Sequence, residues 1–231
     1  MIGMVYVRLL QMKNNEYIKP SNSRTECVLL DHMGSDLTVV NAARVSFNKK
    51  HKKFEEQQDE NLIKYLARHN HWSPFGHASM QFYIKAPVFV ARQLVKHQVG
   101  LVWNEVSRRY VDTGVEFYEP TEWRLAADNK KQGSSEKTIE YDINPVHKFA
   151  KVCYEKMLSV GIAPEMARMV LPQSMYTEWY WSGTLYAFAR VCNLRLAKTA
   201  QKETQEVAAQ ISKHAQKQFP ISWKYLMKGV Q

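Results

Sequence analysis

The sequence predicts one domain that contains both strands and helices. Short β-prone runs at residues 25–31, 78–84 and 173–181 alternate along the chain with longer segments of helical pattern. At 231 residues the chain is long enough for a sizeable core, and no linker rich in proline, glycine or serine divides it. We therefore treat residues 1–231 as a single domain.

Each element is predicted from its local pattern. Strands are expected where β-branched and aromatic residues gather between turn-forming residues, namely at 1–12, 25–31, 78–84 and 173–181. Helices are expected where apolar residues recur on one side of a helical wheel, often with Pro or Asp in the first turn. These segments are 36–47 (a short helix passing into extended chain), 60–69, 87–97, 145–160, 164–170, 184–194, 199–218 and 220–228. Residues 114–144, rich in charge, Gly, Ser and Lys, predict a partly mobile surface excursion.

The composition restricts the partner and the compartment. A formal net charge of +10 predicts an anionic partner, namely nucleic acid, a nucleotide, a phosphorylated metabolite or an acidic surface, and charge alone leaves these open. The chain contains no run of about 18 apolar residues that would span a membrane. Its N-terminus lacks the basic region of a signal peptide. We therefore expect a cytoplasmic protein, in the host cytoplasm if the source is viral, with no membrane partner.

Residue spacing argues against several common sites. Three scattered cysteines without CxxC or histidine spacing, and histidines without an HExxH pair, argue against a disulfide framework and a metal site. The nine glycines form neither GxGxxG nor GxxxxGK(S/T), so a nucleotide or flavin must be held by side chains and local backbone. Twelve tyrosines and six tryptophans in a basic chain can bind RNA, yet no RRM, KH, zinc-finger or helix-turn-helix signature is present. Nucleic acid is therefore not expected as the principal partner.

Residues 87–110 place many polar side chains within a stretch that otherwise has the pattern of a buried segment. On a helical wheel, four of them share one arc at the C-terminal end of the predicted helix: Arg92, Gln93, Lys96 and His97. If residues 104–110 are extended, an acid, a hydroxyl and a guanidinium point to one side: Glu105, Ser107 and Arg109. We expect this stretch to form much of a binding site.

Two further arginines lie among apolar residues. Arg168 follows Met166-Ala167 and precedes Met169-Val170, and Arg195 lies between Leu194 and Leu196. A guanidinium brought into a low-dielectric environment needs an anion nearby. Both arginines are therefore candidates for anion binding.

Five blocks of the sequence resemble the flavin-dependent thymidylate synthases in their order and separations. They are residues 73–79, 86–93, 104–110, 167–172 and 193–195. Together they lie within roughly residues 40–223, and five ordered blocks are far more specific than one. Two departures from the family pattern stand out. Lys96-His97-Gln98, with eight residues before Ser107, replaces Arg-His-Arg with seven, and Thr199 replaces a histidine.

The resemblance implies a fold and an activity. Members of the family have an α/β fold (α+β type) of their own, with a central, mostly antiparallel sheet flanked by helices. They assemble as homotetramers whose active sites are shared between subunits. They methylate dUMP to dTMP in nucleotide biosynthesis, with 5,10-methylenetetrahydrofolate as carbon donor, FAD as redox carrier and NADPH as reductant. The implied partners are thus dUMP, the folate, NADPH and further copies of the chain.

The resemblance also assigns site residues. For dUMP it implies Gln93, Lys96, Glu105, Ser107, Arg109, Arg168 and Arg195, of which Arg195 holds the pyrimidine and is catalytic. For FAD it implies Ser79, Lys96, His97, Gln98, Glu105, Thr184, Tyr186 and Arg190, the last few from a neighbouring subunit. His77 resembles a residue on the folate or nicotinamide side, and a turn histidine bonded to backbone is the equal alternative. No metal is implied.

The residues themselves bear on how a uracil ring could be activated. Methylation at C5 requires either a thiol added at C6 or stabilisation of charge on N3, O2 and O4. Cys192 is the one cysteine near the five blocks and has no adjacent base, so the sequence favours the electrostatic route. Two alternatives stay open. One is a flavin-binding protein of the same fold with weakened or lost synthase activity, and the other is an RNA-binding protein.

Overall fold

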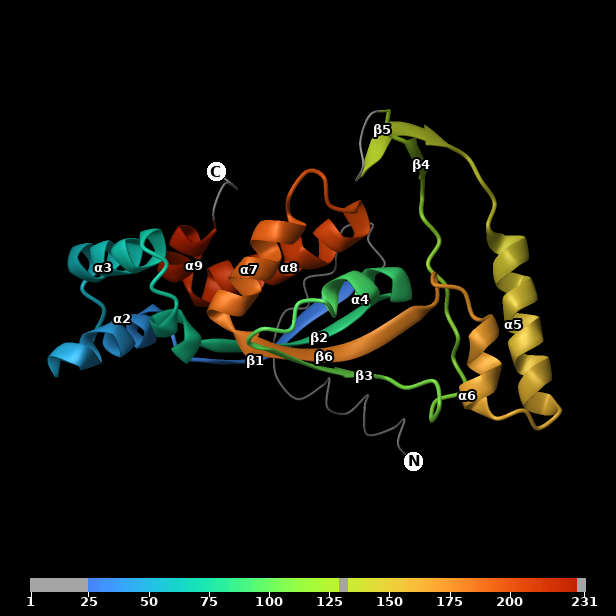
Figure 1. Ribbon diagram of the computed structural model, residues 1–231, viewed down its shortest axis with the longest axis horizontal. Helices are drawn as coiled ribbons and strands as arrows, with labels where there is room; N and C mark the ends of the chain where they lie inside the picture. Colours follow the sequence, from blue (N-terminus) through green and yellow to red (C-terminus); the bar gives the residue numbers. More distant parts are fainter. Residues whose placement is uncertain (1–24, 129–132, 228–231) are drawn as a thin grey trace.

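A four-stranded antiparallel sheet forms the centre of the molecule (Figure 1). The computed structural model describes residues 25–128 and 133–227. The strand order is β1-β2-β6-β3, and each neighbouring pair is antiparallel. The bounds are β1 (Glu26–Met33), β2 (Ser79–Pro87), β3 (Leu101–Glu105) and β6 (Tyr176–Thr184). Two further strands, β4 (Trp123–Ala126) and β5 (Ser134–Ile139), pair only with each other among the described residues.

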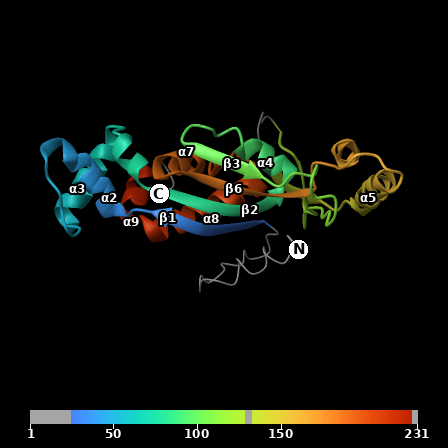
Figure 2. The same ribbon diagram turned by 90° about the horizontal axis from the view of Figure 1, so that it is seen from below.

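Helices cover one face of the sheet and extend beyond both of its ends. Their bounds are α2 (Asp36–Arg44), α3 (Glu56–Arg68), α4 (Val88–Leu94), α5 (Asn144–Ser159), α6 (Pro164–Ala167), α7 (Leu185–Arg195), α8 (Lys202–Gln218) and α9 (Pro220–Leu226). Short 3-10 turns are η1 (Val45–Phe47), η2 (Ser73–His77) and η3 (Arg168–Val170). α4, α7 and α8 lie over the sheet, α2, α3 and α9 gather at one end, and α5 and α6 lie at the other (Figure 1). Figure 2 shows the opposite face of the sheet, which no helix of the described ranges covers.

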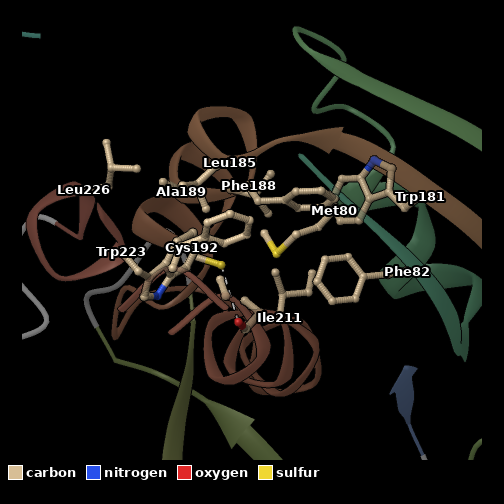
Figure 3. Packing of buried hydrophobic residues seen from close by; sticks show 14 of the residues in the cluster. Met80, Phe82, Trp181, Leu185, Phe188, Ala189, Cys192, Ile211, Trp223 and Leu226 are labelled. Carbon is tan, nitrogen blue, oxygen red and sulfur yellow. Dashed lines mark hydrogen bonds between the residues drawn. The ribbon is translucent and has the colours of Figure 1, made fainter. Parts of the chain in front are cut away.

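The core lies between the sheet and the helices above it. Along β2, every second side chain is buried, including Met80, Phe82 and Ile84, because alternate residues of a strand face the same layer. Phe188 of α7 meets Phe82 edge-on at 5.1 Å and Trp181 of β6 at 5.4 Å between ring centroids (Figure 3). Each such fully buried side chain contributes about 1.5–3 kcal/mol of transfer free energy. This packing fixes α7, and therefore its two ends, against the sheet.

Most predicted elements are confirmed. β1, β2 and β6 correspond to the strands expected at 25–31, 78–84 and 173–181, and helices occupy every predicted helical segment. The strand predicted for residues 1–12 lies outside the described residues. The prediction that the 36–47 helix passes into extended chain is wrong, because η1 continues its turn through Phe47.

The helix predicted over residues 87–97 ends earlier, at Leu94. In a longer helix, the Gln93 carbonyl would accept from the His97 amide. Instead it accepts from Nη2 of Arg195 at 3.0 Å, and the His97 amide donates to the Leu94 carbonyl. The side chain of Arg195, from α7, thus bonds to the carbonyl that would have accepted the next backbone hydrogen bond of α4.

The prediction that residues 104–110 are extended throughout is wrong after β3. The Ser107 carbonyl accepts from the amides of Tyr110 and Val111, each at 3.0 Å, which closes a turn. The Arg108 guanidinium donates to the carbonyls of Val111, Thr113 and Gly114 and so stabilises the loop that follows. Because of this turn, Ser107 and Arg109 do not continue one face of a strand from Glu105.

The 114–144 excursion has more structure than its composition predicts. It contains the β4–β5 pair, and Arg124 of β4 donates to both carboxylate oxygens of Glu203 on α8, at 2.7 and 2.9 Å. Arg124 is partly buried and Glu203 is buried, so this ion pair anchors the excursion to the start of α8. The excursion lies at the surface as predicted, and its described strands form a hairpin tied to α8, which the sequence did not predict.

Candidate active site

The C-terminal ends of α4 and α7 meet at Arg195. Its Nε donates to Nε2 of His97 at 3.0 Å and its Nη2 donates to the Gln93 carbonyl at 3.0 Å. Among the described residues, Arg195 forms no ion pair with a carboxylate, and its Nη1 has no hydrogen-bond partner. The guanidinium is therefore held in place by two bonds while part of its donor set stays available to a ligand.

The electrostatics of this cluster keep His97 uncharged. Burial lowers the pKa of His97, and the nearby cations Arg195 and Arg190 lower it further. Burial also lowers the pKa of Arg195. A neutral His97 can accept the hydrogen bond from Arg195, whereas an imidazolium cannot. The positive charge here thus resides on the arginines.

Gln93 connects the cluster to α8. Its side-chain Nε2 donates to Oε1 of Gln201, and its Oε1 accepts from Oγ1 of Thr204 at 3.3 Å. The sequence predicts Gln93 as a contact for dUMP, but the structure shows its amide bonded within the protein. The sequence does not predict Gln201 or Thr204, because nothing in their local pattern indicates that α8 begins beside α4.

A second part of the site lies at the N-terminal end of α7. Thr184 is opposite Ser79 in the β2–β6 register, and its hydroxyl accepts from the Ala187 amide at 3.1 Å as the N-cap of α7. Gly100 has φ of +76°, and a Cβ there would lie 3.1 Å from the Cβ of Ala187. Glycine therefore permits the loop that carries Lys96 to Gln98 to approach α7 closely.

The predicted flavin contacts border this region. Lys96, Gln98 and Arg190 are exposed or partly exposed, while Ser79, His97, Thr184 and Tyr186 are at least partly accessible. His77 is exposed at the end of η2, and its side chain makes no hydrogen bond among the described residues, which argues against a backbone-bonded turn histidine. The structure therefore gathers the predicted flavin residues around α7, except for Glu105.

A second set of predicted residues lies at and after the end of β3, where Glu105 ends the strand and Ser107 and Arg109 follow it, and in η3, where Arg168 is the first residue. Glu105 accepts hydrogen bonds from Thr177 at 2.7 Å and from the Trp103 indole at 3.1 Å. Arg109 donates to the Ser107 hydroxyl at 3.4 Å, and the exposed Arg168 bonds only to the Glu165 carbonyl of its own helical segment among the described residues.

No hydrogen bond or ion pair joins these two regions among the described residues. Leu101 is opposite Gly183 in the sheet, whereas Glu105 is opposite Trp179, four residues further along β6. At about 3.3 Å per residue, this separates the two ends of β3 by about 13 Å. Of the predicted dUMP residues, Arg195 ends α7 beside α4, Ser107 and Arg109 follow the Glu105 end of β3, and Arg168 lies in η3 after α6.

The charge of both regions suits an anionic ligand. In the described ranges, no carboxylate forms an ion pair with any of the five cations of these regions, which are Lys96, Arg109, Arg168, Arg190 and Arg195.

No group of three metal-ligating side chains occurs in those ranges either. None of the described helices is both long and apolar enough to cross a membrane.

Comparisons with known proteins establish the family. A family model described as thymidylate synthase complementing protein matches residues 28–221. A flavin-dependent thymidylate synthase of Thermus thermophilus is 40% identical over 209 residues, covering 87% of this chain and 76% of that protein. The one from Thermosipho melanesiensis is 38% identical over 208 residues, covering 87% and 89%. The chain belongs to the flavin-dependent thymidylate synthases. It is therefore an enzyme of a methyltransferase family.

Solved structures share the fold of this flavin-dependent thymidylate synthase. PolB of Streptomyces cacaoi, described as a UMP/dUMP methylase and bound with 5-Br dUMP, is 31% identical with a TM-score of 0.79. The match covers 88% of this chain and 94% of PolB. PolB bound with 5-Br UMP gives a TM-score of 0.71 at 30% identity. The predicted α+β fold, an antiparallel sheet flanked by helices, is confirmed.

The residues of this thymidylate synthase also fit a flavin nucleotide. Ser79 and Thr184 are paired in the β2–β6 register before α7, Tyr186 and Arg190 belong to α7, and Lys96 lies in the loop before Gly100 that approaches α7. Neither cation has a carboxylate partner in the described ranges. Hydroxyl and cationic donors suit phosphate oxygens, and an aromatic side chain suits a planar ring. The altered Lys96-His97-Gln98 segment retains one cation and adds one amide, so it still offers donors to an anion.

Proposed function

We propose that this enzyme reductively methylates dUMP to dTMP, with 5,10-methylenetetrahydrofolate as carbon donor, FAD as redox carrier and NADPH as reductant. The observation that carries the proposal is Arg195, held at the junction of α4 and α7 by His97 and the Gln93 carbonyl, without a carboxylate partner among the described residues. FAD bound beside this arginine would supply the electrons that reduce the transferred carbon to a methyl group.

Arg195 is proposed to act on the pyrimidine. Its available donors would bind the N3/O2 edge of uracil and stabilise the negative charge that develops there when C5 attacks the incoming carbon. His97 is a positioning residue that fixes the orientation of the guanidinium. Cys192 is buried, burial raises its pKa, and its Sγ is directed to the Ala208 carbonyl, so a thiolate route has no support in this chain.

The phosphate and sugar of dUMP are proposed to bind the second region, with Gln93 and Lys96 contributing from the first. Arg109 and Arg168 supply forked guanidinium donors for a phosphate dianion, and Glu105 and Ser107 supply an acceptor and a hydroxyl. Because no hydrogen bond or ion pair joins this region to Arg195 among the described residues, we propose that each site combines residues of two subunits. A homotetramer provides that arrangement.

The remaining assignments extend this proposal. FAD would contact Ser79, Lys96, His97, Gln98, Glu105, Thr184, Tyr186 and Arg190. The exposed His77 would lie toward the folate or nicotinamide. We propose a cytoplasmic location, where dUMP, the reduced folate and NADPH are available together, and no metal requirement.

Two measurements test the function. Purified protein is titrated with FAD and monitored by visible absorbance, and dTMP formation is then assayed with methylenetetrahydrofolate and NADPH or NADH. We expect bound flavin, and NADPH oxidation that dUMP accelerates. UMP is a second substrate in the same assay, because PolB is described as a methylase of both nucleotides. Flavin binding without any methylated product would favour the flavin-binding alternative, and absence of flavin binding would contradict both.

A further inference from the structure

Trp72 is an exposed aromatic side chain beside the proposed flavin region. It is the N-cap of η2, immediately before Ser73, and 59% of it is exposed. Its ring lies over Gly76, where a Cβ would come within 3.6 Å of the indole. Much of the apolar surface of this large ring is exposed to water. A ligand that covered this surface would bind with a favourable free energy.

The ring of Tyr186 lies opposite Trp72. The two centroids are 6.3 Å apart and the ring planes are tilted by 42°. Stacked carbon atoms are separated by about 3.5 Å, so a planar ring between two parallel aromatic rings needs about 7 Å between them. The observed spacing is shorter than that value and the two rings are tilted against each other, so a planar ligand ring enters only when both side chains rotate apart and become parallel, a kind of side-chain change that is common on binding.

The position of this pair along α7 restricts what it can bind. Tyr186 lies in the first turn of α7, Arg190 lies one turn later on the same side, and Arg195 ends the helix. At 1.5 Å per residue, Tyr186 and Arg195 are separated by about 13 Å along the axis. The aromatic pair and the Arg195 cluster therefore cannot contact the same ring, whereas one long dinucleotide can reach both.

We propose that Trp72 and Tyr186 bind the adenine ring of FAD between them, and that Arg190 binds the diphosphate. This inference rests on the proposed function, because the redox-active ring must then lie beside the pyrimidine at Arg195. That leaves adenine as the planar ring at the opposite end of α7. Trp72 is thus a cofactor-binding residue in addition to those assigned from the family pattern.

The experiment measures ligand binding without turnover. Flavin-free full-length protein is titrated with FAD by quenching of flavin fluorescence, and ADP is titrated as a competitor against FAD. The variants are Trp72→Ala, which removes the ring, and Trp72→Phe, which retains an aromatic face. Tyr141→Ala is the matched control, because Tyr141 is 62% exposed and lies between β5 and α5, at the other end of the molecule (Figure 1).

We expect Trp72→Ala to weaken the binding of both FAD and ADP by about 5- to 100-fold. This is the range found when an aromatic ring that stacks on a base is removed. Trp72→Phe should retain most of the affinity, and Tyr141→Ala should match the wild type. Because Trp72 is exposed, its truncation should leave the circular dichroism spectrum unchanged.

Other outcomes overturn the proposal in distinguishable ways. Unchanged affinity for both ligands in Trp72→Ala, with normal FAD binding by the wild type, contradicts the stacking but leaves the proposed function intact. Weaker binding of FAD with unchanged binding of ADP would place the isoalloxazine at Trp72 and contradict the adenine assignment. A wild-type protein that binds no FAD would contradict both the stacking and the flavin chemistry.

Discussion

Nε2 of His97 accepts a hydrogen bond from Nε of Arg195, and this requires Nε2 to carry no proton. The pKa of His97 is lowered by burial first and by Arg195 and Arg190 second. The folded protein therefore keeps His97 neutral at a pH where the unfolded chain, with an ordinary value of about 6.5, already binds a proton. The stability that this neutral state contributes is present above about pH 6.5 and is lost as the pH falls through the lower folded value.

We predict a decrease in the melting temperature as the pH falls from about 6.5 toward 5, of which His97 causes one part. In His97→Gln, which can still accept from Arg195 but does not titrate, that part should disappear. Four carboxylates have lowered pKa values, namely Asp59, Glu60, Asp142 and Glu203, and they lose their contributions only below about pH 4.5, outside this window.

His214 is the second histidine that acts in the same pH range. Its pKa is lowered mainly by burial, and its ring bonds to the Cys27 carbonyl at 3.3 Å. Thermal denaturation of wild type, His97→Gln and a matched His214→Gln at several pH values separates the two contributions. An identical pH dependence in wild type and His97→Gln would show that His97 is not neutral in the fold.

At the same scale, local sequence could predict which residues carry chemistry but not all of their partners. Helical spacing predicts that Gln93 and His97 share a polar arc, and the apolar neighbours of Arg195 predict that it binds an anion. Gln201 bonds to Gln93 from 108 positions away. Trp72 likewise meets Tyr186 only through the fold. Pairings at such separations depend on how elements pack, which no local pattern encodes.

Among the elements, α9 begins on a carboxylate that α2 provides. Asp36, the first residue of α2, accepts from the amides of Ile221 at 3.0 Å and Ser222 at 2.8 Å. Pro220 has no amide hydrogen, so these are the first donors of α9 that need an acceptor. A carboxylate there also suits the positive end of the helix dipole. One side chain therefore connects the first described helix to the last.

We predict that Asp36→Ala lowers the free energy of unfolding by about 1–2 kcal/mol, since it removes a cap and leaves two amides without their acceptor. Asp36→Asn retains one acceptor oxygen and should lose less. Asp31→Ala, at an exposed carboxylate of β1, is the control and should stay near the wild type. Chemical denaturation measures all three. Equal stability of Asp36→Ala and wild type would contradict the capping role.

The sequence predicted which helices and strands form, whereas the residues at which they end depended on tertiary contacts. Alternating burial along β2 and apolar spacing in α8 are direct consequences of strand and helix periods. The end of α4 is different, because Arg195 takes the Gln93 carbonyl. The turn after β3 is also different, because Arg108 binds three carbonyls of the following loop. In both cases an arginine donor satisfies backbone acceptors that a local pattern assigns to regular structure.

Across the whole molecule, the proposed dUMP residues fall into two groups, one with Arg195 beside α4 and one with Ser107, Arg109 and Arg168 after β3 and α6, and no hydrogen bond or ion pair joins them among the described residues. The arginines of both groups, which form no ion pair in the described part of the chain, are accessible in the single chain. A bound nucleotide monophosphate must contact a pyrimidine-binding arginine and phosphate-binding arginines together. No hydrogen bond or ion pair within the described part of one chain brings these arginines together. Packing a second copy so that its Arg168 and Arg109 approach Arg195 of the first would complete the site, as expected for a homotetramer with shared sites.

We predict that Arg195→Ala and Arg168→Ala are each inactive as pure proteins, with turnover reduced by about 100-fold or more, because each removes a charge-stabilising donor. Mixed oligomers, made by co-expressing the two variants with different affinity tags and purifying through both, should regain part of the wild-type activity. In such oligomers, some sites combine an intact Arg195 from one subunit with an intact Arg168 from the other. Sedimentation velocity should report the same assembly for wild type and variants, and the exposed Arg68→Ala serves as an active control. Mixed oligomers that stay as inactive as the pure variants would place Arg195 and Arg168 in the same subunit's site and refute the shared arrangement.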